Sequence, residues 1–179
     1  MVLKLYDTLT RKVQDVSPMD GESVRFYACG PTVYGPAHIG NFRTFVMQDV
    51  FRRVMETSGI KTFHVRNLTD VDDKTIRQSQ EEGIGLQDFT AIWTARFQND
   101  CELLNLMVPH KEPSAVGHIP EQIGLIERLI EKDKAYQTKD GSVYFRVEAF
   151  TEYGRLSRLA DREITTSETF RESSDEYDR

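Results

Sequence analysis

Hydrophobic and polar residues alternate along residues 23–30, and residues 61–68 have the same extended, β-branched character. Alternation of this kind is typical of a half-buried β-strand. Between the two runs, residues 41–59 carry apolar side chains at spacings of three and four, which predicts an amphipathic helix. The apolar positions are Phe42, Phe45, Val46, Val50 and Val54. A strand, a helix and a strand within about 45 residues form a βαβ unit, so we expect a parallel sheet with a right-handed crossover.

The predicted helix has a charged side and a clear end. Arg52, Arg53 and Glu56 fall opposite the apolar stripe and are expected to face solvent. Gly59 is expected to cap the helix, because glycine readily adopts the left-handed conformation found just after helix C-termini.

Two further helices are expected after the second strand. The acids around residues 70–73 favour the start of a short helix, since carboxylates complement the positive end of the helix dipole. Residues 86–107 predict a longer helix whose apolar stripe consists of Leu86, Phe89, Trp93, Phe97, Cys101 and Leu104. Because Cys101 lies on this stripe, we interpret it as a small core residue and not as a nucleophile or ligand.

The character of the chain changes after residue 108. Prolines at positions 109, 113 and 120 predict a linker-like stretch, residues 121–136 a helix, and residues 141–147 a strand of a small antiparallel piece. The sequence therefore predicts an α/β fold, with a Rossmann-like parallel-sheet domain over residues 1–115 and a small α+β insertion over residues 116–179. The acidic tail from about residue 165 is expected to be mobile.

Composition limits the class of protein. With 39% hydrophobic and 29% charged residues, the chain can form a core and is not a disordered tail. The net charge of −6 gives no support to nucleic-acid binding, although a local basic face stays possible. Two cysteines without a C-x-x-C pair fit the reducing cytoplasm. Residues 1–13 lack the apolar core of a signal peptide, and we expect no membrane span.

The candidate chemistry lies in residues 29–41, CGPTVYGPAHIGN. His38 and Asn41 fall between the first strand and its helix, where parallel sheets bind ligands and where free N–H groups attract phosphate. Gly40 would let a flat base approach the backbone. The alternative is that His38 only caps or satisfies a turn. Neither a dinucleotide-binding G-x-G-x-x-G nor a P-loop sequence occurs.

Asp70, Asp72 and Asp73 follow the second strand and have two interpretations. A D-x-D pair after a strand is found in phosphatases that form an aspartyl-phosphate, but it would leave residues 29–41 unexplained. We therefore expect these acids to cap a helix and to hold the geometry around Thr69. His64 and His110 have no ligand-like spacing and are interpreted as surface or strand residues.

The ordered set CGPTVY, HIGN and NLTDVDDKTI resembles the cysteinyl-tRNA synthetases, a class I family. HIGN matches that family's form of the HIGH signature, with Asn41 in place of the second histidine. The resemblance continues through LNL, HIP, GSVYFRV and YGRLS, and it concerns the N-terminal part of the family. Residues 112–118, EPSAVGH, depart from the family pattern, so the role of this loop stays open.

The resemblance implies roles for individual residues. Cys29 would be one of four zinc ligands, and the zinc would select the thiolate of substrate cysteine over serine. Gly30 and Thr69 would line the cysteine pocket. His38 and Asn41 would be the catalytic residues that hold the ATP phosphates. The ATP-binding region as a whole would consist of Pro31, Thr32, His38, Gly40 and Asn41.

The implied activity is cysteine–tRNA ligation, in which ATP with magnesium activates cysteine to an adenylate that is then transferred to tRNA(Cys). ATP, cysteine and tRNA(Cys) would be the partners of a monomeric, cytoplasmic protein without membrane contact. Zinc would need three more ligands downstream, and the KMSKS loop would also follow later. The chain alone is therefore expected to be inactive. Alternatives are a non-catalytic paralogue that binds a nucleotide or a partner, and a ligase that joins cysteine to a small amine.

Overall fold

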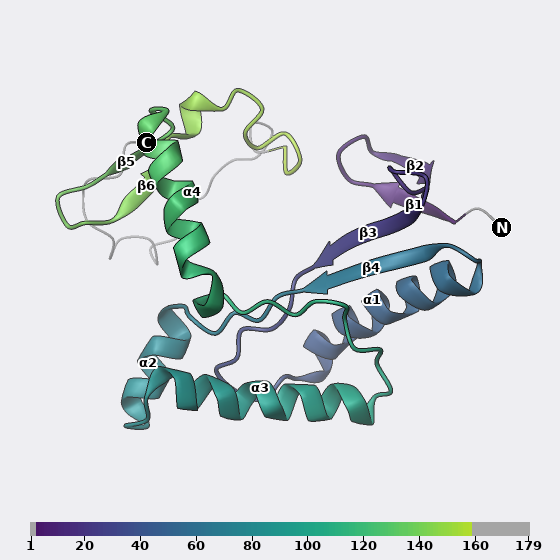
Figure 1. Cartoon of the computed structure of the whole chain (residues 1–179), viewed down its shortest axis with the longest axis horizontal. Helices are drawn as coiled ribbons and strands as arrows, with labels where there is room; N and C mark the ends of the chain where they lie inside the picture. The colour runs from purple at the N-terminus through teal and green to yellow at the C-terminus, as the bar shows by residue number, and fades with distance from the viewer. Residues whose placement is uncertain (1–2, 159–179) are drawn as a thin grey trace. The chain divides into compact units, whose positions relative to one another are not determined.

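The computed structural model describes residues 3–158, which form two compact units (Figure 1). The first consists of residues 3–4 and 15–120, and the second of residues 5–14 and 121–158. The boundary expected after residue 115 stays a prediction, and the acidic tail expected from about residue 165 lies outside the described residues. No helix of the described part is long and apolar enough to cross a membrane.

The first unit contains the predicted βαβ arrangement. Strand β3 (Ser23–Ala28) leads into helix α1 (Ile39–Thr57), which is followed by strand β4 (Lys61–Arg66). The two strands pair in parallel, with Val24 opposite Thr62 and Phe26 opposite His64. The parallel sheet and its crossing helix are therefore as the sequence predicts.

Helix α1 ends as predicted, at a glycine in the left-handed conformation. Gly59 has φ +80°, and its N–H donates to the Glu56 carbonyl at 3.0 Å, while the Ile60 N–H donates to the Met55 carbonyl at 3.0 Å. This pair of bonds is a Schellman motif, which satisfies the carbonyls of the last helical turn.

Part of the stretch interpreted as a linker, residues 110–115, is held along β4 by isolated parallel bridges and backbone hydrogen bonds. Its backbone runs parallel to β4, where the Arg66 N–H donates to the Lys111 carbonyl at 3.0 Å and the Leu68 N–H donates to the Pro113 carbonyl at 2.8 Å. Proline has no N–H to donate, but its carbonyl still accepts from the neighbouring strand. The linker interpretation of this part of the chain was therefore wrong.

Helices α2 (Asp73–Glu81) and α3 (Leu86–Leu103) follow β4. The prediction that the acids cap a helix is confirmed for Asp72, which accepts from the Thr75 N–H at 2.8 Å. Helix α3 ends at Leu103, earlier than the predicted residue 107, and Leu104 is exposed. Cys101 is buried as predicted, in a core formed with Val33, Phe42, Phe45, Leu68 and Phe97.

The predicted orientation of α1 was partly wrong. Val46 and Val50 are 38% and 46% exposed, whereas Asp49 and Arg52 are buried. The Arg52 guanidinium donates to the Glu56 carboxylate and to the Val108 carbonyl, both at 2.8 Å. Buried polar groups that have hydrogen-bond partners cost little free energy. The apolar stripe of α1 alone therefore does not determine which side of the helix is buried.

The remaining elements are short. A hairpin forms from β1 (Lys4–Asp7) and β2 (Lys12–Asp15), and β5 (Ala135–Gln137) pairs antiparallel with β6 (Val143–Phe145), as the predicted antiparallel piece requires. Helix α4 (Ile119–Glu131) ends before the predicted residue 136. Short 3-10 turns lie at Val116–His118 and Val147–Ala149.

Candidate functional site

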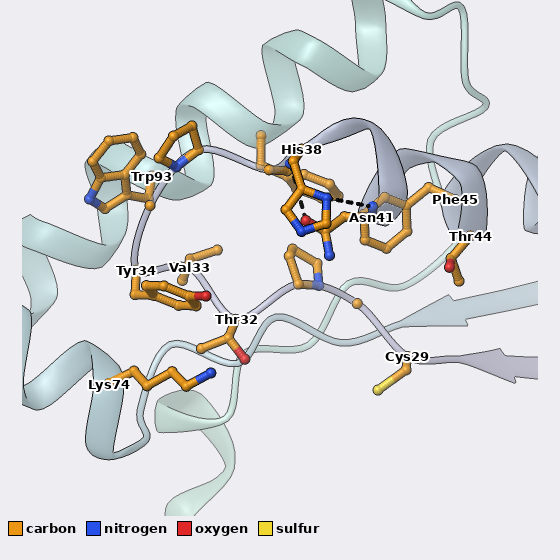
Figure 2. Close-up of a pocket in the computed structure, with 16 residues that line it drawn as sticks. Cys29, Thr32, Val33, Tyr34, His38, Asn41, Thr44, Phe45, Lys74 and Trp93 are labelled. Carbon is orange, nitrogen blue, oxygen red and sulfur yellow. Dashed lines mark hydrogen bonds between the residues drawn. The ribbon is translucent and has the colours of Figure 1, made fainter.

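A cavity of about 350 Å³ lies beside the loop that joins β3 to α1 (Figure 2). Its wall comprises loop residues 29–38 and side chains of three helices. Asn41, Thr44 and Phe45 come from α1, Lys74 from α2, and Trp93 and Phe97 from α3. The cavity therefore lies beyond the carboxyl end of β3, where parallel sheets commonly bind ligands.

Six of the eight residues that the sequence suggested for the site line this one cavity. They are Cys29, Gly30, Pro31, Thr32, His38 and Asn41. Gly40 and Thr69 do not line it. Thr69 instead supports the loop through its backbone, because its N–H donates to the Pro31 carbonyl at 3.0 Å and its carbonyl accepts from the Val33 N–H at 3.1 Å.

His38 and Asn41 form a capping box at the start of α1. The Asn41 N–H donates to His38 Nδ1 at 3.3 Å, and the His38 N–H donates to Asn41 Oδ1 at 3.1 Å. The alternative that His38 caps the helix is therefore confirmed for its Nδ1 atom. Because Nδ1 accepts a hydrogen bond, the neutral ring carries its proton on Nε2, which is a donor.

The side-chain donor atoms of His38 and Asn41 are available to a ligand. Neither His38 Nε2 nor Asn41 Nδ2 makes a hydrogen bond to another residue of the described part. Figure 2 shows these two nitrogens pointing away from α1. Capping therefore orients both side chains and leaves one donor of each free.

The structure gives a reason for glycine at position 40 in addition to the one that the sequence suggested. A Cβ atom at this position would lie 3.0 Å from Cε1 of the His38 ring. The missing side chain therefore makes room for the capping histidine, and the approach of a base to this backbone stays a prediction.

Asn67 holds the loop and was missed by the sequence reasoning. Its Oδ1 accepts from the Gly30 N–H at 2.9 Å and from the Tyr27 hydroxyl at 2.8 Å. A Cβ atom on Gly30 would lie 1.6 Å from the Asn67 carbonyl oxygen, so only glycine fits there. Its place in the sequence could have indicated this role, since Asn67 directly follows β4 at the sheet edge that carries the cavity.

Two of the acids near the cavity have structural partners. Asp72 caps α2, and Asp70 Oδ1 accepts from the Val116 N–H at 2.9 Å. This bond fixes the loop at residues 114–116 against the end of β4, which gives the EPSAVGH segment a structural role. Both carboxylates are engaged by backbone amides, as expected for capping and not for a phosphatase D-x-D pair.

Cys29 is exposed at the rim of the cavity, and its carbonyl accepts from Gln48 Nε2 at 3.2 Å. Zinc sites use three or four protein ligands. Within residues 3–158, no group of three or more His, Cys, Asp or Glu side chains is arranged to hold a metal. The described residues therefore hold no complete set of zinc ligands around Cys29.

The family described as tRNA synthetases class I (C) catalytic domain matches residues 15–178. A cysteine–tRNA ligase of Opitutus terrae is 54% identical over 92% of the chain and 36% of its own length. Another, of Methanosarcina acetivorans, is 44% identical over 99% of the chain and 37% of its own length. A solved ternary complex of Agrobacterium radiobacter K84 LeuRS with tRNA and LeuAMS shares the fold, with TM-score 0.56 and 19% identity over 65% of the chain and 15% of its own.

Proposed function

The chain belongs to the class I tRNA synthetase catalytic domain family that includes the cysteine–tRNA ligases, and on this premise we propose that it is the nucleotide-binding part of a cysteine–tRNA ligase. The chain spans only about a third of the length of the relatives it matches, for instance 36% of the Opitutus terrae protein. Activation of cysteine with ATP, and transfer to tRNA(Cys), are therefore proposed for the protein as a whole.

One observation carries this proposal: the loop suggested by the sequence lines a single cavity at the N-terminus of α1. The helix terminus and the free donors of His38 and Asn41 can stabilise negative charge on phosphate oxygens. Preorganised donors of this kind contribute to catalysis because they need no reorganisation as charge develops. Protein groups in such a reaction position the substrates and do not form covalent bonds to them.

Cys29 is proposed as one zinc ligand, at the rim of the same cavity. Bound zinc would supply selectivity for a thiolate, since it prefers soft sulfur ligands. The described residues hold no complete ligand set, so the remaining ligands must come from outside them. Magnesium is proposed to enter only with ATP. We also propose that the whole protein is monomeric and cytoplasmic.

The test is cysteine-dependent exchange of pyrophosphate into ATP. The 179-residue chain should be assayed alone and with a polypeptide that supplies the remaining part of the Opitutus terrae relative. We expect no exchange by the chain alone and measurable exchange by the mixture, because one thiolate leaves a zinc site incomplete. His38→Ala in the mixture should lower the rate by about two orders of magnitude, the scale of one lost donor at a developing charge.

The outcomes separate the alternatives. Exchange by the mixture without charging of tRNA(Cys), but with transfer to a small amine, would favour the amine ligase. ATP binding without exchange under any condition would favour the non-catalytic paralogue. Robust exchange by the 179-residue chain alone would contradict the assignment of the catalytic groups.

A further inference from the structure

Lys74 contributes a cation to the cavity wall that none of the roles above uses. Its Nζ lies 5.2 Å from the centre of the Tyr34 ring, within the range of a cation–π contact. Lys74 comes from α2 and Tyr34 from the loop after β3, and both line the cavity. Figure 2 shows the lysine side chain extended along the cavity wall with its ammonium directed toward Thr32.

The position of Lys74 within α2 is electrostatically unfavourable. It is the second residue of the helix, where the positive end of the helix dipole favours carboxylates and disfavours cations. Its neighbours Asp72 and Asp73 follow that rule, whereas Lys74 does not. Residues that break a local rule without a structural gain commonly belong to functional sites.

The nearby acids Asp70 and Asp72 are bonded to backbone N–H groups and do not pair with Lys74. Asp72 accepts from the Thr75 N–H and Asp70 from the Val116 N–H. In the part of the chain that the structure describes, Lys74 forms no ion pair with either. The tyrosine ring therefore holds the ammonium in place while leaving its charge available to a ligand.

We propose that Lys74, held by Tyr34, binds an anionic oxygen group of a substrate in this cavity. His38 and Asn41 then present donors from α1, and Lys74 presents a full positive charge from α2. The anion is a phosphate of ATP or the carboxylate of the amino acid, an identification that rests on the proposed function. A cavity of about 350 Å³ is large enough for a small ligand to reach both sides.

The test compares ligand binding by variants of the 179-residue chain. Titration calorimetry with ATP, and separately with L-cysteine, should be carried out on the wild type, Lys74→Met, Lys74→Arg and His38→Ala. Lys61→Met is the matched control, since Lys61 is an exposed lysine on β4 outside the cavity. Lys74→Met keeps the stem on Tyr34 and removes only the charge, so it should lower affinity for one ligand at least tenfold. Lys74→Arg should retain most of the affinity.

Stability separates a binding role from a structural one. Removing a cation from a helix N-terminus should leave the urea unfolding midpoint unchanged or raise it, while affinity falls. Loss of affinity for ATP alone identifies the phosphate as the anion, and loss for cysteine alone identifies the carboxylate.

Two results would overturn the inference. If Lys74→Met binds both ligands as tightly as the wild type while His38→Ala binds ATP more weakly, Lys74 has no binding role and the proposed function stands. If the wild type binds neither ligand, the anion site and the proposed nucleotide site are both wrong.

Discussion

The polar residues at the start of α1 and those in its middle have opposite surroundings. His38 and Asn41, at the start, bond to each other and leave one donor each toward a cavity. Asp49 and Arg52, two turns or more further along, are buried, and their partners are other protein groups. Polar groups closed by protein partners hold the fold, whereas polar groups that keep free donors beside a cavity are available to a ligand.

The middle of α1 belongs to a wider buried polar cluster. We use this name for Asp49, Arg52, Glu56, Thr62, His64, Arg66 and Glu112. Arg66 is 4% exposed, pairs with the Glu112 carboxylate at 2.6 Å and lies 4.9 Å from the centre of the Phe97 ring. This cluster joins α1 and β4 to the extended segment after α3, whose contacting residues lie 46 to 58 positions further along the chain.

Breaking the buried polar cluster should have the largest effect on stability. Arg66→Ala leaves the Glu112 carboxylate without its cation and opens a space beside Phe97. Removing one partner of a buried pair typically costs about 3–5 kcal/mol, and we expect a loss of this size in the free energy of unfolding measured with urea.

The matched control is Arg77→Ala, which removes an exposed pair with Glu81, 3.9 Å apart. Exposed pairs contribute little, so a change of less than about 0.5–1 kcal/mol is expected. Equal losses of unfolding free energy for the two substitutions would refute the idea that a buried ion pair matters more for stability than an exposed one.

The pH dependence of stability should be the next largest effect, and it depends on His64. Burial first, then the Arg66 and Arg52 charges, lower the pKa of His64 from 6.5 to about 4. The unfolded chain therefore binds more protons between these values. Stability contributed by neutral His64 is present above pH 6.5 and is lost as pH falls to about 4, by on the order of 3 kcal/mol.

His64→Phe tests this directly. The ring already stacks on Phe26 at 4.5 Å, and neither of its nitrogens has a hydrogen-bond partner in residues 3–158. Urea unfolding at pH 7, 5.5 and 4.5 should show a smaller decrease for the variant than for the wild type. Exposed His118→Phe should retain the wild-type decrease, and parallel curves for all three proteins would exclude His64 as the cause.

The sequence predicted the features that local patterns determine. The βαβ unit, the glycine end of α1 and the Asp72 cap each depend on residues close together in the chain. The six cavity residues predicted from the sequence could also be found, because they all lie within the single segment 29–41.

Features that depend on distant partners were missed. Arg52 was expected to face solvent because nothing in its own helix shows that the Val108 carbonyl would accept from it. His64 was predicted as a surface or strand residue, and it lies on β4 but is buried. Asn67 and Lys74 entered the site only because β4 and α2 bring them beside a loop some 30 to 40 residues earlier.

The smallest expected effect concerns the backbone of the cavity loop, which Asn67 and Thr69 hold against the end of β4. Gly30→Ala would place a Cβ atom 1.6 Å from the Asn67 carbonyl oxygen, so β3 and β4 must separate at their carboxyl ends. Overpacking of this kind typically costs about 1–3 kcal/mol. Gly35→Ala, in the same loop, meets no atom within 4 Å and should be neutral or slightly stabilising. Urea unfolding of both variants gives the comparison. Equal stability of the two would mean that Gly30 does not lie against the Asn67 backbone, and the close approach of the loop to the end of β4 would be refuted.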